Sequence, residues 1–370
     1  MSLAATKVQN VRAKNPELDK NEHRLSEYGA LDFFVQQSMS NPLLTRETKE
    51  QAIKGAGKVI ETPAIKYDGS VTVATSRTCT IADDENESVL VPYTWKTYQV
   101  GFTMVPAQYS NNDIDYEKDF TAKLKKVARA LGAKMDEDAI AQLEANKTQV
   151  YADTLLYGNT ANVLQVPFAS REEILSDVEP MMEANDFYEG IHIIGNAGIK
   201  SLLNKLDEKG TFQAVDKTLE YANKKFHFSN RLANEEGKYA TFYAVEDGNV
   251  DMLFRYDREA VRGSSANGHE WDIVNMPYLD IPVGLHYYTE VGDQSAIAGT
   301  ATADLTCGIK EFYGFSVDVA YVVAYNSSLS TRANPIMKAE IASGATYAQP
   351  VYVANTEADP VHTKAVGAGA

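Results

Sequence analysis

The clearest pattern of hydrophobic positions along the chain lies between residues 116 and 143. Its apolar members recur at steps of three or four and are Tyr116, Phe120, Leu124, Val127, Leu131, Met135, Ala139 and Leu143. Steps of this size place all of them on one face of an α-helix. Asn112 is a candidate N-cap, and Gly132 costs only about 1 kcal/mol relative to alanine. We therefore predict one helix over residues 114–146, about 50 Å long at 1.5 Å per residue.

The nearly constant steps of four in this stripe favour a helix that lies across a sheet or a subunit body. A coiled coil is the competing interpretation, but its heptads alternate steps of three and four.

Residues 56–108 change to a period of two. Val71 and Val73 alternate with hydroxyl residues, and the apolar positions of residues 98–104 alternate with polar or small ones. β-Branched and aromatic residues at this period predict strands. Residues 82–88, between the two regions, are polar and acidic. We predict a long two-stranded ribbon with a charged tip. Such a ribbon is marginally stable alone in water, so another surface has to cover it, and a neighbouring subunit is a candidate.

Two further segments precede the ribbon. Residues 1–25 are polar without a sustained period and predict an extended arm. A following helix should end at Asn41, because the residue before a proline avoids the helical region. The residues that can share one face of that helix are Leu31, Phe34, Val35 and Met39.

Shorter elements follow the long helix. Ser170 and Glu173 have the spacing of a capping box and predict a helix start. The inward residues of that helix should be Ile174, Val178, Met181 and Met182. The remaining elements predicted by periodicity are a strand at 191–194, a helix at 196–206, strands at 240–245 and 251–256 around a turn at 247–249, a strand at 283–288 at the edge of another sheet, and a strand at 314–325.

Composition and charge narrow the class of protein. The chain of 370 residues is 44% hydrophobic and 23% charged, which indicates a globular protein. Its longest apolar run has seven residues, 319–325, whereas a bilayer span needs about 20. The N-terminus lacks the apolar core of a secretory signal. A net charge of −16 argues against general binding of nucleic-acid phosphates.

The sequence offers no convincing chemical site. Cys79 and Cys307 are far apart, and no two of the six histidines have metal-ligand spacing. Residues 195–201 resemble a phosphate-binding loop, but only two residues separate the glycines and Ile199 precedes the lysine. We expect an ordinary strand–turn–helix corner there. The acidic residues 83–87 lack the glycine and distal glutamate of a calcium loop, which favours a solvated loop. We expect no catalytic, cofactor or metal site.

In this order, the elements resemble those of tailed-bacteriophage major capsid proteins of the Hong Kong 97 type. The resemblance spans residues 1–345 and lies in the order of the elements. The matching segments are the arm, the extended loop at 56–108, the spine helix at 116–143, the start of the axial domain at 171–206, the return through that domain at 276–284, and a peripheral-domain strand at 313–325.

The resemblance implies an α+β fold of the Hong Kong 97 type with an N-terminal arm, an extended β-hairpin loop, a long spine helix, a peripheral domain and an axial domain. The implied divisions are 1–55 for the arm and short helices, 56–108 for the extended loop, 109–170 for the spine helix and peripheral domain, 171–300 for the axial domain, and 301–370 for returning peripheral strands and a C-terminal tail. Some relatives form lysine–asparagine crosslinks, for which no residue pair can be matched here.

The resemblance further implies a non-enzymatic major capsid protein that self-assembles, as hexamers and pentamers, into the icosahedral shell of a virion. The shell would enclose DNA without sequence-specific binding, without a cofactor and away from membranes, and would assemble in the bacterial host cytoplasm. Scaffold, portal and decoration proteins are the expected partners. A separate scaffold is expected because no charged helical segment precedes the arm. The residues expected at subunit contacts are Arg12, Arg24, Val71, Val73, Val91, Trp95, Gly263, Asn267 and His269.

Two alternatives stay open. A bacterial nanocompartment shell of the encapsulin kind shares this fold and encloses protein cargo. A nucleotide-binding enzyme would use Gly195 to Ser201 as its phosphate loop.

Overall fold

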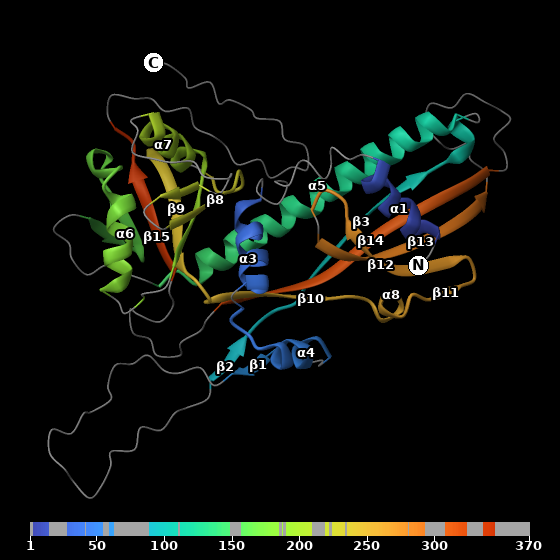
Figure 1. The fold of residues 1–370 in the computed structure, drawn as a ribbon, viewed down its shortest axis with the longest axis horizontal. Coiled ribbons are helices and arrows are strands. Elements are labelled where there is room, and N and C mark those ends of the chain that lie inside the picture. Colours follow the sequence, from blue (N-terminus) through green and yellow to red (C-terminus); the bar gives the residue numbers. More distant parts are fainter. Residues whose placement is uncertain are drawn as a thin grey trace, which may run out of the picture.

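The computed structural model of the chain describes most of the sequence in separate stretches. These are residues 3–14, 28–40, 42–54, 59–62, 89–109, 112–148, 157–184, 187, 190–208, 219–221, 224–233, 235–279, 281–292, 308–323 and 336–344. They form two large β-sheets, one in each half of the molecule, with two helices, α3 and α5, between and across them (Figure 1). The predicted α+β class is confirmed.

The first sheet has six antiparallel strands arranged around the long strand β14 (Gly308–Val323). The order is β10 (Val250–Arg255), β14, β13 (Ile281–Gly292), β12 (His269–Met276) and β11 (Ser265–Ala266), and β3 (Lys96–Met104) also pairs with β14. Both β3 and β10 pair with Asp318 and Val319, so they lie on opposite sides of β14. The strand predicted at residues 314–325 is confirmed as far as Val323 and begins earlier; residues 324–325 lie outside the described part of the chain. The strand predicted at a sheet edge, 283–288, instead lies between β12 and β14.

The second sheet has seven strands of mixed direction. Its order is β4 (Gly158–Thr160), β5 (Val163–Val166), β15 (Ile336–Ala342), β9 (Lys238–Glu246), β6 (Ile191–Gly195), β8 (Lys224–Phe228) and β7 (Leu219–Tyr221). Helices α6 (Ile174–Glu183) and α7 (Ala197–Glu208) pack on it through a shared apolar cluster. The turn at 247–249 therefore joins strands of different sheets, β9 and β10. The interval 171–300, predicted as one axial domain, is divided between the two sheets.

Helix α5 (Asp113–Ala145) confirms the predicted long helix. It has 33 residues, and Asn112 caps its start by accepting a hydrogen bond from the Asp115 backbone N–H at 3.3 Å. The apolar stripe is buried against the six-stranded sheet; Phe120, for example, contacts the rings of Phe102 and Tyr313. The helix therefore lies across a sheet, as its spacing predicts.

The predicted extended arm is wrong over α1 (Leu3–Lys14), which is a helix. Its small apolar residues Ala4, Ala5, Val8 and Val11 are buried against β12 and the main core. Alanine and valine gave little contrast with the polar residues around them, so the helical period was missed. Residues 15–27 lie outside the described part of the chain.

Helix α3 (Gly29–Ser40) ends before Asn41-Pro42, as predicted. Leu31, Phe34 and Val35 are buried, but Met39 is 76% exposed, so its predicted place on the inner face is wrong. Position 39 lies in the last turn, beyond the point where the helix contacts the core.

The ribbon predicted at 56–108 is confirmed at its base and wrong at its last strand. β1 (Val59–Thr62) pairs with β2 (Val89–Pro92), next to α4 (Arg46–Lys54). The strand predicted at 98–104 is β3, which belongs to the six-stranded sheet. Its alternation marked one buried and one exposed sheet face and carried no information about its partner. Residues 63–88 lie outside the described part.

Two short 3₁₀ turns and one short helix complete the description: η2 (Pro106–Tyr109), η3 (Phe168–Ser170) and α8 (Arg258–Arg262). The predicted capping box is wrong, because Ser170 belongs to η3 and α6 begins after Glu173 without a side-chain cap. The four predicted inward residues of α6 are buried. None of the described helices is long and apolar enough to cross a bilayer.

Candidate assembly surfaces

Helix α1 is attached to the six-stranded sheet by polar contacts as well as by its small apolar face. The Lys7 ammonium lies 3.3 Å from Glu311 Oε1 on β14, and the Ala4 backbone N–H donates to Glu270 on β12 at 3.5 Å. The Lys7 side chain is 38% exposed, so water screens this ion pair and it adds little stability. The first helix is therefore held mainly by its four buried small residues.

Glu311 is a buried carboxylate with several hydrogen-bond donors around it. The hydroxyls of Tyr313, at 3.1 Å, and Tyr287, at 3.4 Å, donate to it, as does the hydroxyl of Tyr116 on α5. Burial, followed by the nearby carboxylate, raises the pKa of Tyr287 to about 12, and burial likewise raises the pKa of Tyr116. The phenols therefore stay protonated and remain donors. This network joins β13, β14 and α5 even without Lys7.

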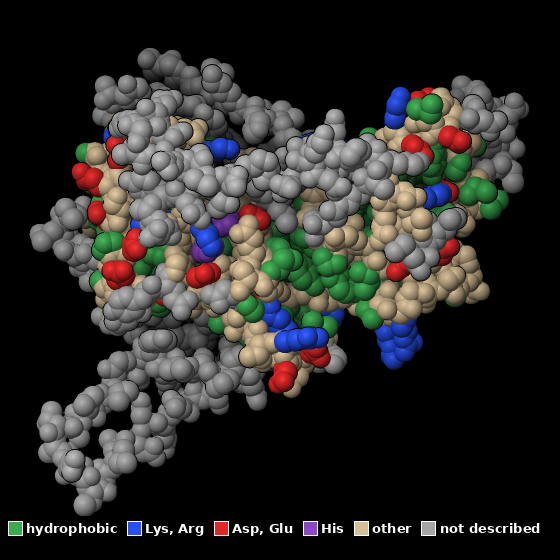
Figure 2. Space-filling model, viewed as in Figure 1, with side chains coloured by type: hydrophobic (Ala, Val, Ile, Leu, Met, Phe, Trp, Pro, Cys, Tyr) green, Lys and Arg blue, Asp and Glu red, His purple; other side chains and the backbone are tan. Residues whose placement is uncertain are grey.

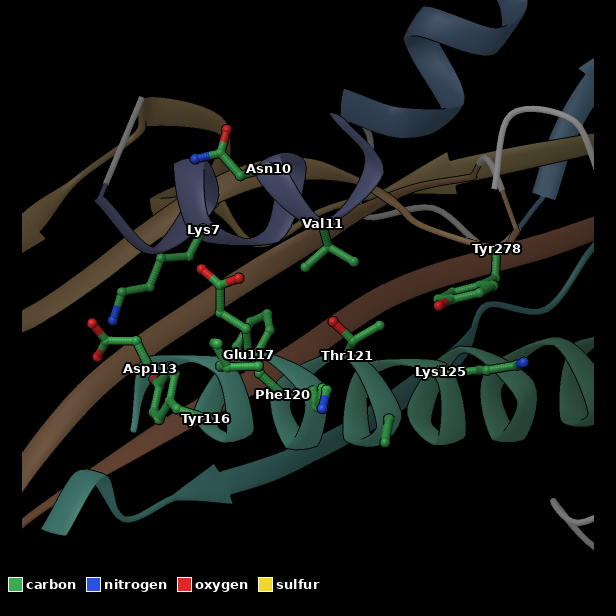
Figure 3. A pocket seen from close by; sticks show the side chains of 13 residues that line it. Lys7, Asn10, Val11, Asp113, Tyr116, Glu117, Phe120, Thr121, Lys125 and Tyr278 are labelled. Atoms are coloured by element: carbon green, nitrogen blue, oxygen red, sulfur yellow. The ribbon is translucent and has the colours of Figure 1, made fainter. Parts of the chain in front are cut away.

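A cavity of about 650 Å³ lies beside this network, between α1 and the first turns of α5. Figure 3 shows Lys7, Asn10 and Val11 of α1 on one side and Tyr116, Glu117, Thr121 and other α5 side chains on the other. Helix α1 thus covers its sheet without filling the groove next to α5.

A second buried carboxylate, Asp136, fixes α3 to the middle of α5. It accepts the Leu31 backbone N–H at 2.9 Å and the hydroxyl of Ser229. Burial raises its pKa to about 6, although these hydrogen bonds act in the opposite direction. Close by, a Cβ on Gly132 would come within 2.7 Å of Leu279 and 2.8 Å of Tyr28, so glycine permits this approach. The junction of the two halves is therefore specified by both packing and polar contacts.

A row of polar groups joins α3 to the seven-stranded sheet. His192 Nδ1 lies 3.0 Å from His227 Nε2, and His227 Nδ1 lies 3.3 Å from Asp32 on α3. On the other side, His192 Nε2 lies 3.4 Å from Asp247, which also accepts from Gln37 of α3 at 2.5 Å. Burial, then repulsion from His227, lowers the pKa of His192 to about 4. His192 is therefore neutral at neutral pH.

The residues that flank the β1–β2 ribbon pack into a separate apolar cluster. Its buried members are Leu44, Tyr93, Leu253, Ala320 and Val322. Lys49 of α4 pairs with the fully buried Asp251 at 2.7 Å, and Asp251 also accepts the Leu44 N–H at 3.0 Å. Removing one partner of such a pair leaves an uncompensated buried charge. These contacts attach α4 and the residue directly after β2, Tyr93, to β10 and β14.

The predicted contact residues fall in three places. Val91 lies in β2, and Trp95 lies just after that strand. The Arg255 guanidinium is 4.7 Å from the centre of the Trp95 ring. Gly263 ends α8 at φ +60°, Asn267 occupies the following β11–β12 turn at φ +53°, and His269 opens β12. Arg12 lies in α1. Arg24, Val71 and Val73 lie outside the described residues.

Sequence reasoning missed several residues that the structure gathers around His269. Trp271, His286, Tyr288 and Phe312 lie beside it on one face of the six-stranded sheet. Their signal was present in the sequence, since aromatic and imidazole side chains recur at a period of two along 269–271, 286–288 and 312. It could be interpreted only with the strand pairing known.

The resemblance of residues 195–201 to a phosphate loop has a packing explanation. A Cβ on Gly198 would lie 2.3 Å from the Tyr239 carbonyl oxygen, and one on Gly195 would lie 2.8 Å from Ile199. The backbone N–H groups of Gly198 and Ile199 already donate to Asn196 Oδ1, at 3.0 and 3.4 Å. The glycines let α7 approach β9, and the amides that a phosphate would need are occupied.

Among the described residues, no group of three or more histidine, cysteine, aspartate or glutamate side chains is placed to hold a metal ion. Cys79 and Cys307 lie outside them.

Comparisons with family models and with curated sequences give no match. Among solved structures, the chain is similar to one from Gordonia phage Cozz, with 13% identity over 79% of this chain and 83% of that chain and a TM-score of 0.41. It is similar to the capsid of an empty GTA particle, with 11% identity over 81% and 92% and a TM-score of 0.41. It is also similar to the SrpI encapsulin of Synechococcus elongatus PCC 7942, with 12% identity over 72% and 81% and a TM-score of 0.34. Because these TM-scores are low, function has to be inferred from this chain's own residues.

Proposed function

We propose that this protein is the structural subunit of an icosahedral shell, the major capsid protein of a tailed bacteriophage, and that it has no enzymatic role. The observation that carries the proposal is the β1–β2 ribbon. Among the described residues its strands pair only with each other, while an ion pair of α4 and an apolar cluster attach the flanking residues to the six-stranded sheet. A two-stranded ribbon attached through its flanking residues needs cover from another surface, and a second copy of the chain provides one.

The two sheets are joined by helices, so that contacts made by one half of the subunit are mechanically linked to contacts made by the other. Helix α5 spans 33 residues and is bonded through Asp136 to α3, which also contacts the seven-stranded sheet. In this proposal the seven-stranded sheet with α6 and α7 forms the axial domain. The six-stranded sheet with α5 forms the peripheral domain. The assignment replaces the single axial interval 171–300.

The net charge of −16 fits a container for DNA, because an acidic inner wall does not hold the genome back during packing. The shell is expected to form in the bacterial host cytoplasm with scaffold, portal and decoration proteins. The virion capsid is its final location.

Electron microscopy of particles purified from expressing cells tests this proposal, together with analysis of their contents. Closed particles that contain DNA support a phage shell. Closed particles that contain a bacterial enzyme support the nanocompartment alternative. Absence of any particle, alone or with neighbouring phage gene products, contradicts both.

A further inference from the structure

Five partly exposed rings form a continuous row on one face of the six-stranded sheet, which we call the aromatic face: His269, Trp271, His286, Tyr288 and Phe312. Trp271 and His286 are directly opposite on β12 and β13, and their rings stack at 4.7 Å with 2° between the planes. Tyr288 and Phe312 are directly opposite on β13 and β14 and stack at 4.5 Å with 3° between the planes. The rings hold one another in place.

The aromatic face is the side of the sheet that α1 and α5 leave uncovered. Along β14, buried residues such as Tyr313 and Phe315 point to the core under α5, whereas Phe312, Gly314 and Ser316 alternate with them and are partly exposed. Gly314 stands directly opposite both His286 and Gly101 of β3. The row of rings therefore borders a stretch of sheet without side chains, onto which another surface can pack closely.

The solvent side of an antiparallel sheet is normally polar. Here it carries tryptophan, tyrosine and phenylalanine, the residues enriched in the centres of protein–protein interfaces. Rings already fixed by stacking lose little conformational freedom when a partner packs on them, which lowers the cost of association.

Helix α8 places two exposed arginines beside this face. It packs on β12 and β13 and exposes Arg258, Arg262 and Val261, the last at 61%, next to the exposed Asp257 and Glu259. Among the described residues neither arginine has an ion-pair partner. Figure 2 shows Lys and Arg side chains projecting at the lower margin beside α8, whereas elsewhere on this face basic and acidic side chains are interspersed. The whole chain has a charge of −16, so another copy offers a complementary acidic surface.

We propose that the aromatic face, together with Arg258 and Arg262 of α8, binds a second copy of this chain. The rings supply the apolar centre of the contact and the two arginines its charged margin. The partner copy supplies carboxylates from a different part of its surface. The contact is therefore head-to-tail and can propagate around a ring. This inference rests on the proposed shell function and assigns one of its contact surfaces.

Tryptophan fluorescence tests the contact, because the chain has only two tryptophans, Trp95 and Trp271. In the Trp95→Phe chain, emission comes from Trp271 alone. Acrylamide quenching of that emission should fall about twofold or more when purified chain assembles, because an interface centre excludes solvent. A thermal melt matching that of the native chain shows that the substitution leaves the fold intact. Particles in which quenching of Trp271 is unchanged overturn the contact and leave the shell function standing. A chain that stays monomeric at every concentration overturns both.

A charge reversal gives an independent test. Arg258→Glu with Arg262→Glu should raise the concentration needed for assembly about tenfold or more, because like charges then meet at the contact. Lys200→Glu with Lys225→Glu, two exposed lysines of the other half, makes the same change in net charge and is the matched control. Equal increases in the assembly concentration of the two double variants overturn the proposal, since the change in net charge would then explain the weaker assembly.

Discussion

The Lys7 ammonium lies 3.3 Å from Glu311 Oε1, which joins the first helix of the chain to its longest strand across 304 positions of sequence. Lys7 is the half-exposed partner, and Glu311 keeps the hydroxyls of Tyr116, Tyr287 and Tyr313 as donors when Lys7 moves away. Loss of the Lys7 contact therefore leaves no buried charge unsatisfied, and α1 remains attached to the sheet by its buried small residues.

The two ends of this ion pair should differ sharply in stability experiments. We expect Lys7→Ala to lower the free energy of unfolding by about 0–1 kcal/mol, as for other exposed pairs. Glu311→Ala leaves three phenol donors without their acceptor and should cost about 1–3 kcal/mol or more. Urea unfolding of both variants measures the difference. A larger loss from Lys7→Ala than from Glu311→Ala would show that α1 is held by the ion pair after all.

Acid should destabilise the protein through the His192–His227 row. The pKa of His192 is lowered, mainly by burial, so below its ordinary value of 6.5 the unfolded chain takes up a proton that the folded chain does not. Stability present above pH 6.5 is then lost as the pH falls toward about 4, by roughly 1–3 kcal/mol. Unfolding curves at pH 7.5 and 5 measure this loss.

The matched variant for this prediction is His192→Gln, which cannot titrate. Its unfolding free energy should change less between the two pH values than that of the native chain. An unchanged pH dependence in His192→Gln would assign the acid sensitivity to other groups.

The contribution of Asp136 to the unfolding free energy should depend on pH with the opposite sign. Burial raises its folded-state pKa to about 6, so its contribution is favourable at low pH and is lost as the pH rises through 6. Asp136→Asn keeps an acceptor for the Leu31 N–H and gains a donor for Ser229. Relative to the native chain, we expect the variant to gain stability between pH 5 and pH 8, by about 1–3 kcal/mol. A difference in unfolding free energy between the two proteins that stays constant from pH 5 to pH 8 would contradict a buried, charged Asp136.

The corner at residues 195–201 gives a prediction that separates packing from nucleotide binding. Gly198→Ala places a methyl group 2.3 Å from a backbone oxygen and should destabilise the fold by about 1–3 kcal/mol or more. Lys200→Ala removes an exposed side chain and should change stability by less than about 0.5 kcal/mol. Calorimetry with ATP should show no binding to the native chain. Binding that Lys200→Ala abolishes would support a phosphate loop instead.

Secondary structure was most predictable from the sequence where one hydrophobic period continued over many residues. The stripe from Tyr116 to Leu143 defines α5 almost to the residue, because eight consecutive turns bury the same face. Asn112 was identifiable as its cap from side-chain chemistry alone. The inward residues of α6 were predictable for the same reason, even though its capping box was not.

Partners across the sheets could not be predicted, because alternation shows that a strand has two faces without saying which strand lies beside it. β3 was therefore assigned to a ribbon, although it pairs with β14 more than 200 residues away. The same limit hid the aromatic face, whose five rings come from three strands. Likewise, His192 and His227 are 35 positions apart and meet only because β6 and β8 are parallel neighbours.

Sedimentation velocity of the purified chain over a wide concentration range tests the central claim, assembly into a shell, most directly. The account predicts a cooperative change from slow, subunit-sized species to one fast, narrow boundary, with few intermediates, because closed shells gain contacts that open ones lack. A single boundary for a 40.7 kDa monomer at all concentrations, with or without companion phage proteins, would contradict it.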